Sequence, residues 1–283
     1  MEKPEERREP GEEHRRRRVS RIAELFAENR AAKKPVLIGY ITAGDPTPER
    51  TPGLVAAMER GGVDLIELGV PFSDPIADGP VIMKASERAL AAGTTLKKVL
   101  EIARAVRSHS DIPILLFSYL NPLMRYGFEK LAAEAREAGV DGCLLTDLSV
   151  EEAGEFVTPM RAAGLDTVFL AAPTSPPERL RLVAEHSSGF VYLVSRTGVT
   201  GERAQLSASV GPLVEQLRGL TKLPLAVGFG ISKPEQAGET AKLADGVVVG
   251  SAYVRLVETH GGGPELETKL EEYSRALKAG MVS

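Results

Sequence analysis

The residues best suited to chemistry lie in one stretch, Leu65 to Pro80, which reads LIELGVPFSDPIADGP. It begins as a short apolar strand that contains one carboxylate, Glu67, and continues as a proline-rich loop that carries Asp78. A carboxylate within an apolar strand is costly to bury, so it needs either a partner or a function. A structural salt bridge would explain Glu67. The alternative is a general acid/base whose apolar surroundings raise its pKa toward neutrality.

Short apolar runs at regular intervals predict the elements that position these carboxylates. The runs are nearly continuous in apolar residues, as parallel strands covered on both faces should be. They span residues 35–42, 63–69, 112–119, 140–147, 165–172, 189–195, 223–230 and 244–250. Amphipathic helices are expected between them, at residues 49–60, 94–108, 128–138, 150–163, 176–185, 205–219 and 233–243. Eight such strand–helix units favour an α/β protein of the (β/α)8 class, a TIM barrel, over an open sheet.

The chain divides into a charged tail and one barrel domain. Residues 1–18 are almost entirely Glu, Arg, Pro and Gly and cannot bury apolar area, so we expect them to be disordered. Residues 19–283 are expected to form the single barrel domain, with an extra N-terminal helix that Ser20 caps. Four aspartates precede strands, at the end of a barrel where special residues usually serve stability, and we interpret them as structural. They are Asp64, Asp141, Asp166 and Asp245.

Composition limits the possible chemistry and partners. The net charge of -4 gives no reason to expect nucleic-acid binding, and no apolar run approaches the length of a membrane helix. The one cysteine, Cys143, fits a reducing compartment, and the N-terminus has no secretory signal, so we expect a cytoplasmic protein. No histidine falls at a strand end, so no metal site is expected. Acid–base work is left to carboxylates and tyrosines.

The active face of a barrel lies at the carboxyl ends of its strands. The predicted strands deliver polar and aromatic residues there: Tyr40, Thr42, Asp45, Glu67, Asp78, Tyr119, Asn121, Asp147, Tyr192, Ser195 and Arg196. The last two strands are followed by GFGIS (228–232) and VGSA (249–252), whose glycines and serines are typical of a phosphate site. Those glycines could also simply shape tight turns. The segment 195–208 is predicted to be a mobile lid over a bound anion, with a solvated surface loop as the alternative.

Several motifs, taken in chain order, resemble one family, the tryptophan synthase alpha subunit. They are YITAGDPT (40–47), ELGVPFSDPIADGP (67–80), SYLNPL (118–123), YLVSRTGVTG (192–201), GFGIS (228–232) and VGSA (249–252). The resemblance implies a lyase that cleaves indole-3-glycerol phosphate by a retro-aldol step into indole and glyceraldehyde 3-phosphate, in the last stage of L-tryptophan biosynthesis. It also implies an αββα heterotetramer in which indole passes to a beta subunit. Pyridoxal phosphate would belong to that partner, and this chain would need no cofactor.

The same resemblance implies roles for individual residues. Glu67 would protonate indole C3 and take the proton from the glycerol hydroxyl, Asp78 would hold the indole N–H, and Tyr192 would orient Glu67. Substrate binding would fall to Tyr40, Thr42, Tyr119, Arg196, Thr200, Gly201, Gly228, Phe229, Gly230, Gly250 and Ser251. The loop 71–74 and the region of residues 121–122 would face the beta subunit. Ser149 stands where the family commonly has a proline, which bears on the geometry of that interface.

Other functions remain open at this point. Another phosphate-sugar barrel enzyme, such as an isomerase, would share the phosphate corner but not the set formed by Glu67, Asp78 and Tyr192. A barrel kept only to bind and activate a beta subunit would have a damaged acid/base set. A standalone lyase that releases free indole would have the same sequence features as the alpha subunit.

Overall fold

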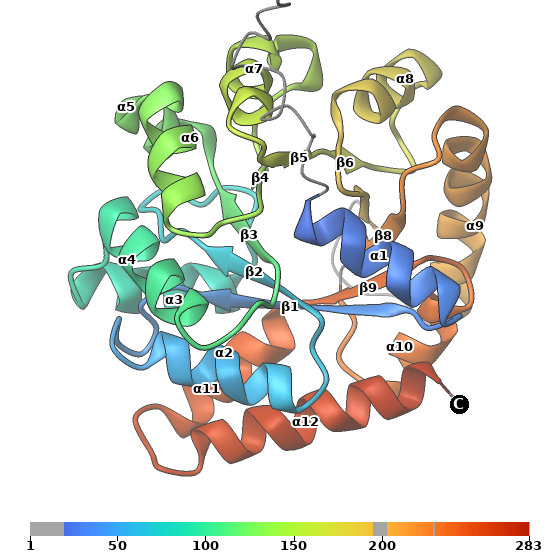
Figure 1. The fold of residues 1–283 in the computed structure, drawn as a ribbon. Helices are drawn as coiled ribbons and strands as arrows, with labels where there is room; N and C mark the ends of the chain where they lie inside the picture. The colour runs from blue at the N-terminus through green and yellow to red at the C-terminus, as the bar shows by residue number, and fades with distance from the viewer. Residues whose placement is uncertain (1–19, 195–202, 229, 283) are drawn as a thin grey trace, which may run out of the picture.

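The computed structural model describes residues 20–194, 203–228 and 230–282. The predicted tail, most of the predicted lid and Phe229 lie outside these ranges. Within them the parallel strands form a ring that is surrounded by helices (Figure 1). The strands are β1 (Val36–Thr42), β2 (Leu65–Gly69), β3 (Ile114–Ser118), β4 (Gly142–Leu145), β5 (Asp166–Val168), β6 (Leu170–Ala171), β7 (Val191–Val194), β8 (Leu225–Gly228) and β9 (Gly246–Val249).

The strand order confirms the predicted parallel barrel. The order of pairing is β5-β4-β3-β2-β1-β9-β8-β7-β6. The predicted strand over residues 165–172 is divided into β5, which pairs with β4, and β6, which pairs with β7. Because β5 and β6 are consecutive pieces of one extended segment, this order closes the barrel. The other predicted strands are present with their ends shifted by at most two residues.

Helices surround this ring on the outside, except the first, which covers one end of it. They are α1 (Arg21–Ala31), α2 (Thr51–Arg60), α3 (Pro80–Ala91), α4 (Leu96–Arg107), α5 (Leu120–Tyr126), α6 (Phe128–Glu137), the short 3-10 turn η1 (Val150–Glu152), α7 (Gly154–Ala162), α8 (Pro177–His186), α9 (Arg203–Leu220), α10 (Pro234–Ala241), α11 (Ser251–His260) and α12 (Leu266–Met281). Four of them, α3, α5, α11 and α12, are not among the predicted helices. None of the helices in the described ranges is both long and apolar enough to cross a bilayer.

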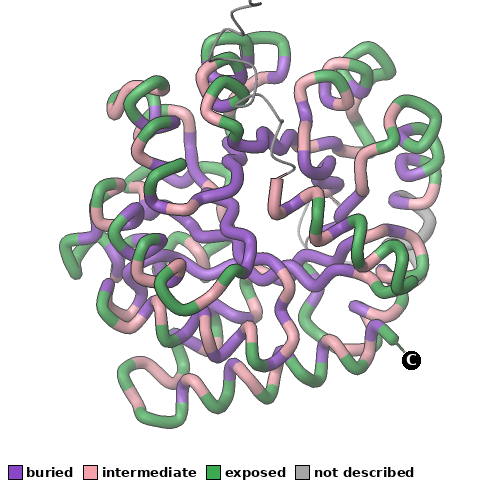
Figure 2. Tube along the Cα trace, viewed as in Figure 1, coloured by how far each residue is buried: buried purple, intermediate pink, exposed green. Residues whose placement is uncertain are grey.

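Successive side chains along a strand point to opposite faces of the sheet, which produces two separate apolar layers. On β1, Leu37 and Ile41 point outward into the large core between strands and helices, whereas Val36 and Ile38 point into the barrel. The N-terminal helix α1 lies across one end of the ring and closes it with Ile22 and Phe26 (Figure 1). Figure 2 shows the resulting pattern, with buried strands inside and exposed outer faces on the helices.

The structural aspartates hold neighbouring strands together at the end of the barrel that α1 covers. Asp64, Asp141 and Asp245 each accept a hydrogen bond from a backbone N–H of an adjacent strand, at 2.6, 2.9 and 2.8 Å. The donors are Leu37, Ile114 and Leu225, respectively. The same three carboxylates pair with the basic side chains Lys278, Arg107 and Arg218. Their contacts agree with a structural role, since every one of these partners belongs to the framework.

Candidate active site

Glu67 points into the barrel from the middle of β2. Leu65 faces the interior and Ile66 the outer core, so the next inward position on the strand belongs to Glu67. Its neighbours in register are Tyr40 on β1 and Leu115 on β3. The side chain is 1% exposed, and its Oε1 atom has no hydrogen-bond partner among the described residues. Burial raises the pKa of Glu67 to about 8.

The apolar setting of Glu67 favours the acid/base interpretation over a structural salt bridge. No Lys, Arg or His side chain of the described residues forms an ion pair with it. An ionised carboxylate without a partner would be strongly disfavoured at this depth. The side chain therefore carries its proton at neutral pH and can give that proton to a bound molecule.

Asp78 reaches the same cavity from the loop between β2 and α3. Gly79 and Pro80 begin α3 directly after it, which fixes where the loop ends. Partial burial raises the pKa of Asp78 to about 6, and hydrogen bonding from the Tyr119 hydroxyl offsets part of that rise. The same hydroxyl accepts a hydrogen bond from the backbone N–H of Ala77, 3.0 Å away. Asp78 is thus mostly ionised at neutral pH while Glu67 is mostly protonated, and the two can take different roles.

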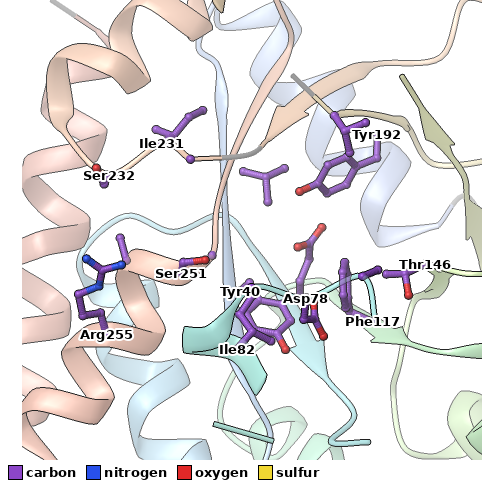
Figure 3. Close-up of a pocket in the computed structure, with 18 of the residues that line it drawn as sticks. Tyr40, Asp78, Ile82, Phe117, Thr146, Tyr192, Ile231, Ser232, Ser251 and Arg255 are labelled. Carbon is purple, nitrogen blue, oxygen red and sulfur yellow. The ribbon is translucent and has the colours of Figure 1, made fainter. Parts of the chain in front are cut away.

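Two tyrosines line the same cavity as Glu67, Tyr40 on β1 and Tyr192 on β7, and Figure 3 shows both of them. Burial raises the pKa of both phenols above the usual value, and the Glu67 carboxylate raises each of them further. Both hydroxyls therefore remain neutral and can donate hydrogen bonds. In the described part of the chain, no hydrogen bond is present between Tyr192 and Glu67. The orienting role of Tyr192 accordingly stays a prediction.

A single cavity of about 710 Å³ connects these groups with the glycine–serine loops. Its inner end is formed by inward-facing strand residues, and its other end by the β8–α10 loop and the first turns of α11 (Figure 3). The strand residues are Tyr40, Glu67, Phe117, Leu170, Tyr192 and Val248. The volume lies within the range typical of small-molecule sites.

The far end of the cavity has the features of an anion site. Gly230 has φ +73°, a conformation that favours glycine, and it lines the cavity with Ser232. Gly250 precedes α11 without a side-chain cap, so the first N–H groups of that helix, beginning at Ser251, are open to a ligand. The positive end of the helix dipole lies at the same place. A phosphate group suits this corner.

The predicted site residues fall into three groups. Glu67, Asp78, Tyr192, Tyr40, Gly230, Gly250 and Ser251 line the one cavity. Thr42, Tyr119 and Gly228 are not among its lining residues. Thr42 is hydrogen-bonded to the Tyr40 hydroxyl, and the Tyr119 hydroxyl accepts the Ala77 N–H. Gly228 lies against the hydroxyl of Tyr192. Arg196, Thr200, Gly201 and Phe229 lie outside the described residues.

Two other carboxylates at the strand ends form contacts that stabilise the barrel framework. Asp45 forms a two-pronged ion pair with Arg88 of α3, with both distances 2.8 Å. Asp147 accepts the backbone N–H of Leu120 at the start of α5. These carboxylates are therefore occupied away from the cavity.

Sequence reasoning missed several cavity residues. Phe117, Thr146 and Leu170 line it from β3, the end of β4 and β6. The alternation of inward- and outward-facing side chains along β3 and β6 could have indicated that Phe117 and Leu170 face the cavity. Arg255 lines the cavity from α11, and no signal was available for it because that helix was not predicted.

These observations define a class of protein: a parallel β/α barrel enzyme with two carboxyl groups of unlike pKa and an anion-binding corner in one cavity. Residues 26–282 match the family model described as "Tryptophan synthase alpha chain". A tryptophan synthase alpha chain of Solibacter usitatus is 62% identical over 262 residues, which cover 93% of this chain and 98% of the relative. One of Geotalea daltonii is 52% identical over 94% of this chain and all of the relative.

Solved structures agree with the sequence relatives. The crystal structure of the alpha subunit of tryptophan synthase from Legionella pneumophila superposes with a TM-score of 0.86 at 36% identity, covering 93% of this chain and 99% of that one. A chain in a crystal structure of tryptophan synthase from M. tuberculosis gives 0.84 at 34% identity, over 93% and 99% of the two chains. This chain belongs to the tryptophan synthase alpha chain family and is a lyase of tryptophan biosynthesis.

Proposed function

We propose that Glu67 and Asp78 divide the work of cleaving indole-3-glycerol phosphate. Glu67, protonated at the start, gives its proton to indole C3, which leaves a cationic indolenine ring. Asp78, ionised, accepts the indole N–H hydrogen bond and stabilises the positive charge. What supports this division is the difference in pKa between the two carboxyls, about 8 and about 6, within one cavity.

The second half of the reaction returns the proton to Glu67. Its carboxylate takes the proton of the hydroxyl on the carbon attached to indole C3. The bond between that carbon and C3 breaks, its electron pair restores the aromatic ring, and the carbon becomes the aldehyde of glyceraldehyde 3-phosphate. The indole ring accepts the electrons of the broken bond, so this chain needs no cofactor of its own in the proposed mechanism.

The remaining predicted residues bind and enclose the substrate in this proposal. Tyr40 walls the indole pocket together with Tyr119 and Phe229, and Tyr192 orients Glu67. The corner formed by Gly230, Gly250 and Ser251 binds the phosphate. Arg196, Thr200 and Gly201 also contact the substrate in this proposal, while Thr42 and Gly228 support the neighbouring tyrosines.

We propose that a beta subunit docks near the mouth of the cavity and receives the indole. Two exposed apolar side chains support this choice of surface: Ile76, which is 85% exposed in the β2–α3 loop, and Met124, which is 55% exposed on α5. Both lie next to the segments expected to face a partner, 71–74 and 121–122. An αββα complex would cover them. Pyridoxal phosphate would be held by the partner alone.

We also propose that residues 19–283 fold without the tail formed by residues 1–18, and that the protein works in the cytoplasm. Ser20 supports the boundary, because its side chain accepts the Ala23 N–H at the start of α1 and donates to Asp166. A chain that starts at Val19 should keep both contacts and retain the melting temperature and activity of the full chain. A lower value of either would place the tail within the folded protein.

An indole-release assay tests the proposed reaction. The purified chain is incubated with indole-3-glycerol phosphate, and indole and glyceraldehyde 3-phosphate are both quantified, with and without a beta subunit. We expect equal amounts of the two products, formed slowly by the chain alone and faster with the partner. Conversion to an isomer without indole would favour another phosphate-sugar enzyme. Release only by the partner would favour a non-catalytic activator, and equal rates with and without it would favour a standalone lyase.

A further inference from the structure

The cavity has acidic side chains at one end and a basic side chain at the other. Glu67 and Asp78 are the acidic side chains among its described lining residues, and both lie at the inner end. Arg255 is the basic side chain among those same residues, and it lies at the other end, on α11. In Figure 3 its guanidinium group projects toward the region between Ser232 and Ser251. A ligand with an anionic group at one end would therefore be oriented by the cavity itself.

Arg255 lies where a phosphate in the corner would be within reach. It follows Ser251, the first residue of α11, by four positions, so the two side chains share one face of the helix. Long side chains in helices point back toward the N-terminus, which directs the guanidinium over the first turn. That first turn is the one whose N–H groups form the anion corner.

The guanidinium has no partner in the described part of the chain, in contrast to other basic residues nearby. Arg88 is paired with Asp45, and Glu258, which shares α11 with Arg255, pairs with Arg88 and Lys84. A cation over the positive end of a helix is electrostatically unfavourable on its own. An anionic ligand in the corner would remove that penalty and use the free donors of Arg255.

We propose that Arg255 binds the phosphate group of the substrate and makes this site prefer phosphorylated over unphosphorylated indole glycerols. The inference rests on the function proposed above and adds a side chain to its phosphate site. Arginine presents a planar set of donors that matches two phosphate oxygens at once, so the contact adds both charge and geometry to the backbone N–H groups. The ionised Asp78 at the inner end repels the phosphate, so the indole ring is directed toward Glu67.

The test compares Arg255→Gln and Arg255→Lys with the matched control Arg181→Gln, which removes an exposed arginine from α8, outside the cavity. Binding of inorganic phosphate and of uncharged indole-3-propanol is measured by calorimetry, alongside kcat and KM for indole-3-glycerol phosphate. We expect Arg255→Gln to weaken phosphate binding and raise KM roughly three- to tenfold, as for a partly exposed charge-assisted hydrogen bond. The value of kcat and the affinity for indole-3-propanol should stay within about twofold, since neither depends on the phosphate contact.

The two further variants sharpen the result. Arg255→Lys should recover part of the phosphate affinity, and Arg181→Gln should match the wild type. The inference is overturned if Arg255→Gln binds phosphate like the wild type, or if it loses indole-3-propanol binding to the same extent. Failure of the wild type to release indole would contradict the proposed function instead, and the phosphate measurements would still decide the role of Arg255.

Discussion

The hydroxyl of Tyr192 lies against Gly228 of the neighbouring strand, where a Cβ atom would come within 2.3 Å of the phenol oxygen. The same relationship occurs on the other side of Glu67, where a Cβ on Gly69 would come within 2.2 Å of the Tyr40 hydroxyl oxygen. Glycine at the carboxyl ends of β8 and β2 thus leaves room for Tyr192 and Tyr40, the two tyrosines near Glu67. Gly228 therefore contributes to the site by leaving space for the Tyr192 hydroxyl.

Replacing Gly228 with alanine should displace Tyr192 and lower the rate of indole release. We expect a loss of roughly 10- to 100-fold, because small displacements of positioned groups have effects of this size. The control is Gly219→Ala on α9, where a Cβ would meet nothing within 4 Å. It should leave activity and the circular dichroism spectrum unchanged. Normal turnover by Gly228→Ala would show that the position of Tyr192 is unimportant.

The wild-type chain should have a bell-shaped dependence of kcat/KM on pH. Asp78 must be ionised and has a pKa of about 6, so activity should fall as the pH drops below that value. Glu67 must be protonated at the start and has a pKa of about 8, so activity should fall as the pH rises above that value. Initial rates of indole release from pH 5 to 9.5 provide the measurement. A profile without a decline on the alkaline side would contradict a protonated Glu67 in the free enzyme.

The acidic decline can be assigned with Tyr119→Phe. Hydrogen bonding from Tyr119 lowers the pKa of Asp78, so its loss should raise that pKa and move the acidic decline to higher pH. Titration of the substrate phosphate would not respond to this change. Tyr126→Phe, which removes a hydroxyl bonded to Glu134 outside the cavity, is the matched control. An unshifted decline in Tyr119→Phe would assign it to a group other than Asp78.

The barrel was predictable because parallel strands covered on both faces leave a nearly continuous apolar signal. Glu67 was predictable because it interrupts such a signal with a charge. Two of the four missed helices left weak signals: α5 has only seven residues and follows β3 almost directly, and α3 begins within the proline-rich loop. The apolar spacing of Leu266, Leu270 and Leu277 was a usable signal for α12, but no helix was predicted there.

Within the site, residue type alone does not tell which way a side chain points. Thr42 and Gly228 lie at strand ends as predicted, yet their contacts are with the tyrosines that line the cavity. Arg255 is far in sequence from every predicted motif except VGSA, and only the helical turn after Ser251 brings it to the cavity. Contacts that depend on packing between segments distant in sequence could be identified only from the structure.

Glu67→Gln should increase stability more at high pH than at low pH. The folded protein holds the Glu67 proton up to a pH of about 8, whereas an unfolded chain releases it near the ordinary glutamate pKa of 4.5. Between those values the folded state binds more protons than the unfolded state, so the wild-type free energy of unfolding falls as the pH rises. Glutamine does not titrate, and its advantage should grow from pH 4.5 to 8 to an order of a few kcal/mol.

Urea unfolding of wild type and Glu67→Gln at pH 5 and pH 8.5 measures this difference. Glu239→Gln, which neutralises an exposed carboxylate on α10, serves as the control and should show no comparable trend. A constant difference between wild type and Glu67→Gln at the two pH values would mean that the Glu67 carboxyl does not have a raised pKa in the folded chain.

The most direct test of the mechanism is the rate of indole release by Glu67→Gln at saturating indole-3-glycerol phosphate. The amide keeps the shape of the side chain but can neither donate the proton to C3 nor accept it from the hydroxyl. The account predicts a decrease in kcat of at least roughly 10²–10⁴-fold, with binding of inorganic phosphate and indole-3-propanol retained. Turnover within a few fold of the wild type would contradict the assignment of Glu67 as the acid and base of this reaction.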